Sequence, residues 1–310
     1  MKKLIAGITI LAALFFMAIY IFIPSTLTVS NIVYCKATQP GTYRMLISNA
    51  KWQQWWIDKN ASTQNNFIYK GDKYSLSNFY DNGVGINIQY RNKTINSELR
   101  VLELVYDSVG IQWKFLIQTG LNPFKKISNY KKAVALKENT KDILNHFKNF
   151  VEQDENIYGI TIKLSSIEHI FMITTKKFYQ HDPSTEEVYY NINFLKRFAA
   201  THNLKQDYYP MMNVIKNNDS SYRLMVALPV NKETNFTGNI HSVRMVQGNF
   251  MVTEVKGGYA TINNALNEMQ LYFNDYEKTA MAIPFQYIIT DRMNEPDTTK
   301  WITKIYAPVY

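Results

Sequence analysis

The sequence has 310 residues, of which 46% are hydrophobic and 14% aromatic, and its formal net charge is +9. This length and apolar content allow two ordinary domains with their own cores, and they exclude a chain that is disordered throughout. A single cysteine, Cys35, excludes an internal disulfide and a cysteine-rich zinc site.

The chain opens with an apolar segment that is long enough to cross a membrane. Lys2 and Lys3 precede an uncharged run from Leu4 to Ile23, and about 20 helical residues span roughly 30 Å, the thickness of a hydrocarbon core. A secretory signal has a shorter apolar stretch and a small-residue cleavage site, which this segment lacks. We therefore expect residues 1–24 to be a single-pass transmembrane anchor, with the two lysines in the cytoplasm and the body extracytoplasmic. A buried core helix is the alternative.

Charge is distributed unevenly over the rest of the chain. Residues 25–153 contain 17 basic and 9 acidic residues, a net charge of +8, whereas residues 154–310 contain 15 basic and 16 acidic residues, a net charge of −1. The change falls in a polar run, EQDENIYG, between a predicted helix and a predicted strand, which suits a linker. We therefore expect two domains after the anchor, 25–153 and 154–310.

The first of these domains has the pattern of an antiparallel sheet followed by a long helix. In GIQWKFLIQTG, alternation places Trp113 on the apolar face of a strand. From about Phe124 to Val151 the pattern becomes helical, and the first apolar stripe consists of Ile127, Tyr130 and Val134. Such a sheet must wrap around the helix to bury its apolar face, which predicts an α+β fold.

The opening of this domain, IPSTLTVSNIVYCKATQPGTYRMLISNAKWQQWW, is similar to that of bacterial polyketide cyclase-like proteins. These belong to the START/Bet v 1 (SRPBCC) superfamily and begin with an IP…V strand, then a helix that leads to W..W. The resemblance extends over about residues 24–153. It implies a helix-grip fold with a cavity between the sheet and the long helix, often holding a hydrophobic ligand. Trp113 is the candidate ligand contact there.

The predicted long helix is strongly basic. We interpret its lysines as a solvated face, with attraction to anionic lipids near the anchor as the second interpretation. Nucleic-acid binding is the third; no recognised DNA-binding helix accompanies the charge, and the body is expected outside the cytoplasm, so no nucleic-acid partner is expected. The lysines are Lys125, Lys126, Lys131, Lys132, Lys137, Lys141 and Lys148.

The second domain contains an internal repeat. YPMMNVIKNNDSSYRLMVALPV aligns with IPFQYIITDRMNEPDTTKWITKIYAPV, so that Pro210 matches Pro284 and Leu228–Val230 matches Ala307–Val309. A predicted strand and a predicted helix precede each half. Two strand–helix–strand–strand units in series predict a pseudo-twofold duplicated α+β domain.

This domain resembles the GyrI-like, or bacterial transcription-activator effector-binding, family. The matching residues are Gly257–Tyr259 at the start of a helix, Pro284 before a strand, and the pattern W-x-T-x-I-Y-x-P-V at Trp301–Val309. The resemblance covers residues 155–310. It implies a small-molecule pocket between the two halves; family members serve as ligand domains of transcription regulators, and some stand-alone members hydrolyse small substrates.

One strand of that domain, IPFQYIITD, carries a lone polar residue that bears on catalysis. The family usually has a glutamate there and a tyrosine two residues later, whereas this chain has Gln286 and Ile288. Alternation places both on one face, and Met212 and Val214 are their counterparts in the repeat. A glutamine donates and accepts hydrogen bonds but cannot act as a base. We therefore expect non-catalytic binding of neutral, partly apolar molecules, with Gln286 as a ligand contact or, alternatively, as part of an internal hydrogen-bond network.

Aromatic residues are the candidate walls of the second pocket: Tyr209, Tyr259, Trp301 and Tyr306. The rival interpretation is a hydrolase or cyclase that uses Glu168 or Glu254, which a deep carboxylate with a raised pKa would favour. A third is a scaffold whose pockets are filled by side chains.

The remaining patterns point away from common catalytic sites. No phosphate-loop or G-x-S-x-G spacing is present, and KGGYA is best explained as a turn that needs glycine. The five histidines lack the i, i+4 spacing of a helical metal site. We expect no metal and no cofactor, and as partners a small hydrophobic or aromatic molecule and the membrane.

Overall fold

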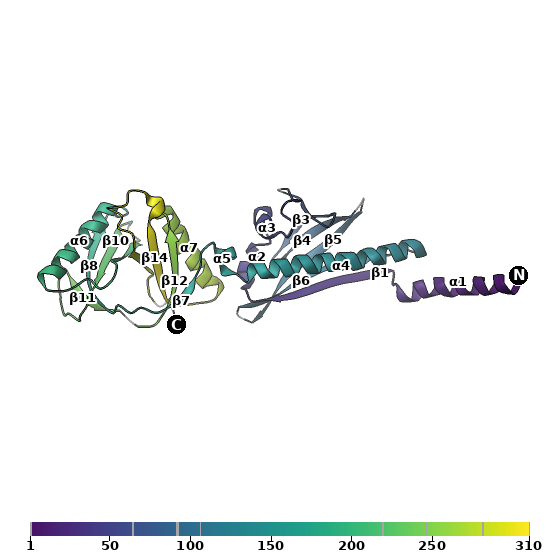
Figure 1. Cartoon of the computed structure of the whole chain (residues 1–310), viewed down its shortest axis with the longest axis horizontal. Helices are drawn as coiled ribbons and strands as arrows, with labels where there is room; N and C mark the ends of the chain where they lie inside the picture. The colour runs from purple at the N-terminus through teal and green to yellow at the C-terminus, as the bar shows by residue number, and fades with distance from the viewer. Residues whose placement is uncertain are drawn as a thin grey trace. The chain divides into compact units, whose positions relative to one another are not determined.

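The chain divides into two compact units, Met1–Ile157 and Tyr158–Tyr310, each built on an antiparallel sheet (Figure 1). The computed structural model describes residues 2–63, 65–90, 93–105, 107–218, 220–245, 247–280 and 282–309. The predicted α+β class is confirmed. The division predicted from charge falls a few residues before this boundary, at the start of helix α5 (Asp154–Tyr158). Independent folding of the two parts stays a prediction.

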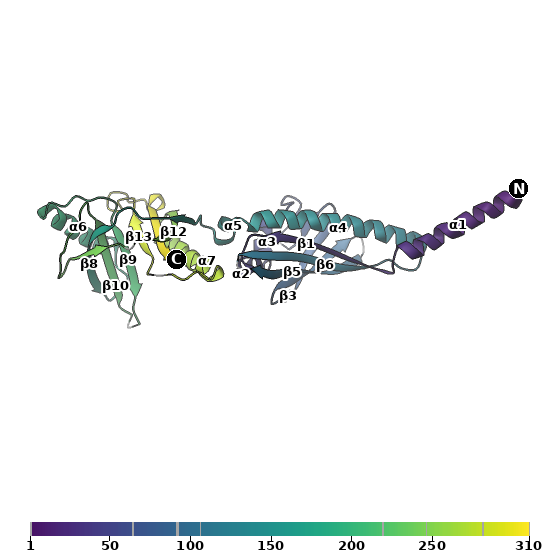
Figure 2. The ribbon, with the colours of Figure 1, turned by 90° about the horizontal axis from the view of Figure 1, so that it is seen from below.

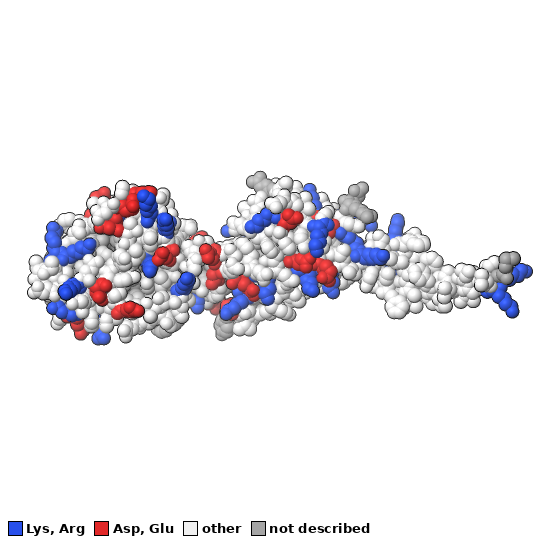
Figure 3. Space-filling view, in the orientation of Figure 1, with Lys and Arg blue, Asp and Glu red and all other residues white. Residues whose placement is uncertain are grey.

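Helix α1 (Lys2–Phe22) contains the apolar N-terminal segment, and only Ile19 in it is buried. It is the one helix in the described part of the chain that is long and apolar enough to cross a membrane. Its surface carries charge only at its N-terminal end (Figure 3). Its C-terminal end meets the first unit, where the Tyr20 hydroxyl donates to the carbonyl of Leu121 at 2.6 Å. α1 is therefore a candidate membrane span.

The first unit is a six-stranded antiparallel sheet in the order β1–β6–β5–β4–β3–β2, with helix α4 along one face (Figures 1 and 2). Its strands are β1 (Thr26–Cys35), β2 (Phe67–Tyr69), β3 (Asp72–Tyr80), β4 (Gly83–Tyr90), β5 (Lys93–Val105) and β6 (Ser108–Gln118). Its helices after α1 are α2 (Gln39–Arg44), α3 (Asn49–Trp55) and α4 (Pro123–Val151). Asn122 starts α4 as the N-cap, because its side chain accepts from two main-chain amides of the first turn.

Aromatic side chains fill the centre of this unit. Trp52 and Trp55 of α3, together with Trp56, are fully buried, and their indole rings contact one another. The Trp55 ring lies 4.3 Å from that of Phe147 on α4, centroid to centroid. Close-packed rings therefore occupy the space between the sheet and the long helix at this level.

The face that α4 turns to the sheet differs from the predicted stripe. Tyr130 and Val134 are exposed, whereas Lys126 and Lys132 are turned inward. The Lys132 ammonium lies 2.6 Å from a carboxylate oxygen of Asp72, and the side chains of the pair are 12% and 3% exposed. The prediction that all the helix lysines are solvated is thus wrong for these two, because partners on other elements decide which side of the helix is buried.

The second unit is an eight-stranded antiparallel sheet in the order β11–β8–β10–β9–β13–β14–β12–β7. Its strands are β7 (Lys163–Ser165), β8 (Phe171–Tyr179), β9 (Met211–Lys216), β10 (Tyr222–Pro229), β11 (His241–Arg244), β12 (Asn249–Lys256), β13 (Phe285–Ile288) and β14 (Ile302–Val309). Its helices are α6 (Thr185–Thr201), α7 (Tyr259–Asp275) and a short 3-10 helix, Thr298–Lys300. At the centre of the sheet, Gln286 of β13 pairs directly with Met212 of β9.

Strand register assigns the side chains of this sheet to two faces. Directly paired residues share a face, so the pairs Met212–Gln286 and Gln286–Ile305 place one set of residues together. We call this the helix face; its central residues are Met212, Gln286, Ile288, Thr303 and Ile305. The opposite side, the aromatic face, carries a buried cluster that includes Phe250, Phe285, Tyr287 and Tyr306.

Candidate functional site

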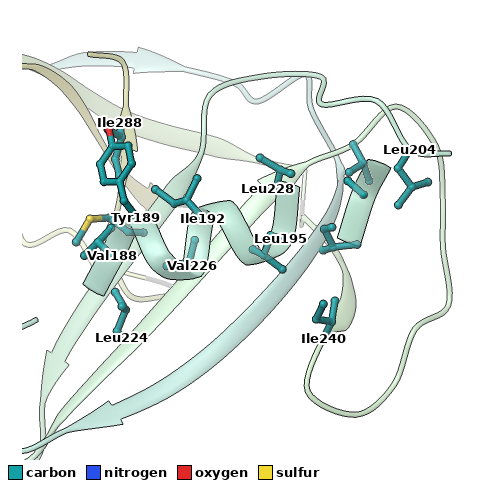
Figure 4. Close-up of a cluster of buried hydrophobic side chains, with 14 residues drawn as sticks. Val188, Tyr189, Ile192, Leu195, Leu204, Leu224, Val226, Leu228, Ile240 and Ile288 are labelled. Carbon is teal, nitrogen blue, oxygen red and sulfur yellow. The ribbon is translucent and has the colours of Figure 1, made fainter. Parts of the chain in front are cut away.

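The predicted ligand residues Met212, Val214, Gln286 and Ile288 all lie on the helix face. Met212 and Ile288 are buried in one cluster with residues of α6, and Val214 packs against that cluster. Figure 4 shows Val188, Tyr189 and Ile192 of α6 near Ile288. The shared face that alternation predicted is therefore present, and α6 covers one side of it.

Gln286 differs from its apolar neighbours in having a side-chain amide that no described residue engages. The residue is half-buried, and its side chain makes no hydrogen bond within the described ranges of the chain. The described residues therefore do not support the alternative that Gln286 belongs to an internal hydrogen-bond network. A half-buried amide without a partner can still donate and accept hydrogen bonds to another molecule.

Two of the predicted wall residues lie away from Gln286. Tyr306 stacks on Phe285 at 5.6 Å on the aromatic face and meets Tyr287 edge to face. Tyr209 contacts Tyr208, which in turn contacts Tyr287. Burial raises the pKa of the Tyr287 and Tyr306 hydroxyls above their usual range. Because successive residues of a strand point to opposite sides, Tyr287 and Tyr306 do not line one pocket with Gln286. Tyr209 precedes β9 and is connected to these tyrosines through Tyr208.

The other two wall residues, Tyr259 and Trp301, meet at one end of the helix face. Their rings are in edge-to-face contact at 5.5 Å. The Tyr259 hydroxyl also lies 2.9 Å from the hydroxyl of Thr185, so the first residues of α6 and α7 are adjacent. The Trp301 indole N–H donates to the carbonyl of Glu295 at 2.8 Å, which holds its ring in place.

Between these rings and the sheet lies Arg292, a residue that the sequence analysis missed. It is only 4% exposed, and its guanidinium carbon lies 4.9 Å from the Trp301 ring centre and 5.4 Å from that of Tyr259. One guanidinium nitrogen, Nη2, donates to the Thr303 hydroxyl at 2.9 Å. Nε and Nη1 have no acceptor, and no ion pair among the described residues includes Arg292. Strand alternation could not predict its face, because β13 ends at Ile288 and Arg292 lies in the turn that follows.

The N-terminus of α7 borders the same place. Gly257 has a φ of +146°, and a Cβ there would lie 2.5 Å from the Thr261 hydroxyl, so the prediction of a glycine-dependent turn is confirmed. Gly258 is the N-cap and offers no side chain, and the first turn contains no acidic residue. The first amides of α7 therefore lack a side-chain cap.

The candidate catalytic residues Glu168 and Glu254, and the candidate ligand contact Trp113 of the first unit, do not share the surroundings of Gln286. Glu168 is exposed in a loop, and the side chain of Glu254 is exposed and lies 3.6 Å from the ammonium of Lys304. Trp113 is fully buried; its indole donates to the Ser97 hydroxyl at 2.9 Å, and its ring meets Tyr74 edge to face. The described residues contain no group of three histidine, cysteine or acidic side chains that could hold a metal ion.

The first unit has an open groove of about 1440 Å³ near the N-terminal half of α4. Lys93, Lys114, Lys125 and Lys132 line it together with amide and hydroxyl side chains, and Glu98 is its one acidic residue among those described. Lys114 and the neighbouring Phe115 point to opposite faces of the sheet. The groove is therefore an open depression around the end of the sheet and not an enclosed cavity.

No protein-family model matches the sequence, and no curated protein matches it. Several solved structures are similar to part of the chain. The C-terminal domain of EcmrR is 17% identical, with a TM-score of 0.42, covering 49% of this chain and 98% of that one. SAV2435 bound to tetraphenylphosphonium is 16% identical, with a TM-score of 0.34, covering 49% and 94%. A hydrolase from Listeria innocua is 12% identical, with a TM-score of 0.35, covering 48% and 92%. At these identities and TM-scores, none of the likenesses assigns a family or a function to this chain.

Proposed function

We propose that this chain is a small-molecule-binding protein and that its site is the helix face of the second sheet, between α6 and α7. The observation that carries the proposal is the free amide of Gln286, half-buried among apolar residues at the centre of the sheet. A second polar group without a partner, the buried hydroxyl of Thr253, lies on the same face, because Thr253 pairs with Ile305. Apolar walls with a few convergent polar groups are typical of ligand sites.

Internal symmetry supports this location. The elements β8–α6–β9–β10 are followed by β12–α7–β13–β14, the order expected of a duplicated unit. In the repeat alignment Met212 is the counterpart of Gln286, and the two residues pair with each other. We infer that a pseudo-twofold axis passes between them. At a ligand site on that axis, the two equivalent positions would present the apolar side chain of Met212 and the amide side chain of Gln286.

Non-catalytic binding suits this site better than catalysis. Glu168 and Glu254, the acids on which a hydrolase or cyclase would depend, are exposed to solvent. Gln286 cannot take up a proton from a substrate at neutral pH. In the first unit, the resemblance to START/Bet v 1 proteins implies a ligand cavity beside Trp113, but Trp113 is fully buried and is not among the residues that line the open groove.

Binding on the helix face can be tested with two substitutions at Gln286. Gln286→Trp should fill the space over the sheet and abolish binding of neutral aromatic probes. Gln286→Leu should retain binding of indole and weaken that of benzamide, because the leucine keeps the site apolar but removes the amide that can hydrogen-bond to a polar probe. The measurement is isothermal titration calorimetry of benzamide and indole with the full chain in lipid nanodiscs, against empty nanodiscs. A folded tryptophan variant that binds like the parent would place the site elsewhere, and a parent that binds neither probe would contradict the proposal.

Attachment to the membrane is the other part of the proposal. We infer that α1 anchors the chain with its lysine-bearing end in the cytoplasm and the two units outside, because an α1 that is exposed along its length requires an apolar environment. The full-length protein should keep Met1 after expression in bacteria, and protease added to spheroplasts should digest both units. A mature N-terminus near residue 25, or complete protection from the protease, would contradict this arrangement.

A further inference from the structure

We propose that Arg292 and the N-terminus of α7 form a binding site for the carboxylate of an aromatic small molecule, at the end of the helix face. The inference rests on the proposed function and names the class of ligand. It changes one expectation from the sequence, where Gln286 alone suggested a neutral ligand, because Arg292 adds a buried positive charge to the same face.

The first argument is the missing partner of Arg292. A guanidinium has five N–H donors and is always charged in proteins. At 4% exposure, Arg292 has exchanged water for the Thr303 hydroxyl and two aromatic rings. The rings attract the cation but accept no hydrogen bond in the plane of the guanidinium, and Nε and Nη1 remain without an acceptor. Buried charges are normally paired, so this arrangement calls for an anion.

The nearby acidic side chains do not supply that anion. Asp291, the preceding residue, accepts from the main-chain N–H of Met293 and from the side-chain amide of Asn294. Glu295 and Asp297 lie on the following loop and have the ammonium of Lys300 within 3.9 Å and 3.6 Å. All the acids close to Arg292 in sequence are thus engaged with other groups.

The second argument is the uncapped start of α7. The N-terminus of a helix carries partial positive charge and free N–H groups, which favour an anion. In α6 these N–H groups have a side-chain cap, because Ser184 and Glu187 form a capping box. α7 has a glycine at the N-cap and no acid in its first turn. The ring of Tyr259, the first residue of α7, lies against the Arg292 guanidinium, and a carboxylate between the guanidinium and the helix start would satisfy both.

The shape of the surroundings indicates an aromatic acid. Tyr259 is 39% exposed and stands at the edge of the site, where ring movement would admit a flat molecule. The Trp301 ring is available for contact with a flat ligand. Ile288 pairs with Thr303, the hydrogen-bond partner of Arg292, and lies two residues from Gln286 on the same face of the sheet. An arene carboxylate would place its charge at Arg292 and its ring among Tyr259, Trp301 and Ile288.

The experiment compares benzoate with its neutral counterpart benzamide, and with inorganic phosphate, on the full chain in nanodiscs by calorimetry. Benzoate should bind at least about tenfold more tightly than benzamide in the parent, a difference typical of one charge-assisted contact. Arg292→Met should remove that preference, so that the variant binds benzoate no more tightly than benzamide. Arg292→Met should also melt no lower than the parent, because replacing an unpaired buried charge by an apolar chain of similar length removes a desolvation cost.

A matched pair at Gly258 tests the helix terminus without removing the arginine. Gly258 has an ordinary φ of −79°. A Cβ there would lie 3.1 Å from the Cβ of Thr298, a close contact that both variants share, so it cancels when they are compared. Gly258→Asp brings a carboxylate of its own to the site and should weaken benzoate binding at least about tenfold relative to Gly258→Asn, which has the same shape.

The outcomes separate this inference from the proposed function. Equal affinity for benzoate and benzamide in a parent that binds both would overturn the anion site while leaving small-molecule binding intact. Phosphate binding as tight as benzoate would overturn the aromatic class, and a marked fall in melting temperature for Arg292→Met would make Arg292 a structural residue. If neither benzoate nor benzamide binds, the proposed function fails together with the site.

Discussion

Replacing Lys132 by methionine should lower the free energy of unfolding of the first unit by about 3–5 kcal/mol. The ammonium of Lys132 lies 2.6 Å and 2.8 Å from the two carboxylate oxygens of Asp72, which also accepts from the amide of Asn139 at 3.2 Å. Asp72 is almost completely buried. Without the lysine, its carboxylate would remain inside the protein with one neutral donor, and the cost of that uncompensated charge dominates the effect.

Two further variants test whether the unpaired charge of Asp72 causes this loss of stability. Asp72→Asn combined with Lys132→Met removes both charges and should recover a large part of the loss. Lys70→Met breaks the pair between Lys70 and Asp142, which is exposed to solvent, and should have little effect on the free energy of unfolding. If Lys132→Met were as mild as Lys70→Met, the inward position of Lys132 would be wrong.

Urea unfolding can be followed in the first unit alone through its cysteine. Cys35 is buried, and burial raises the pKa of its thiol to about 12, with the negative charge of Glu152 adding to the shift and Lys148 opposing it. The thiol should therefore react with a disulfide reagent only when the unit opens, because the thiolate is the reactive form. Cys35 is the single cysteine of the chain and lies in the first unit, so the reaction of its thiol does not report on the second unit.

Trp52→Ala should cost about 3–5 kcal/mol, the range found for large aromatic residues replaced by alanine in a core. The Trp52 ring contacts those of Trp55, Trp56 and Phe67, and its indole N–H donates to the carbonyl of Leu46 at 2.8 Å. Trp52 lies inside helix α3, where alanine is the most favourable residue for the backbone. The loss therefore reports the cavity and the freed carbonyl and not a weaker helix.

The control for this substitution is Gln53→Ala, the next residue on α3, which is exposed and should change stability by less than about 0.5 kcal/mol. Added indole should restore part of the stability of the first unit in Trp52→Ala and leave the first unit of the parent unchanged, as followed by the Cys35 thiol, since a ligand stabilises only a unit that has room for it. A stabilised first unit in the parent would instead mean that this unit already holds an open apolar cavity, as the START/Bet v 1 resemblance implies.

Several elements could be predicted because local periodicity and side-chain size are sufficient to specify them. The apolar run of α1 needs no partner to be recognised, and the long helix from Pro123 to Val151 begins at an N-cap asparagine followed by proline. Alternation predicted that Gln286 and Ile288 share a face, and the repeat added Met212, because a strand presents every second residue to the same side.

Other features depend on which elements meet, and the sequence contains no local signal for that. The apolar stripe predicted on α4 was wrong at Tyr130 and Val134, because the partner of Lys132 lies on β3, distant in sequence. Tyr306 appeared to belong with Gln286, but strand register places it on the opposite face.

Arg292 is the clearest example of a residue whose surroundings depend on tertiary structure and not on the local sequence. The chain by itself determined an anchor-like helix, two α+β parts and the face on which Gln286 lies, since these follow from composition and from periods of two and 3.6 residues. It could not show that Arg292 would be buried without an anion, because burial and partners come from Trp301, Tyr259 and Thr303 converging on it from other segments. That convergence places a buried positive charge on the face of Gln286, which the sequence pattern alone did not predict.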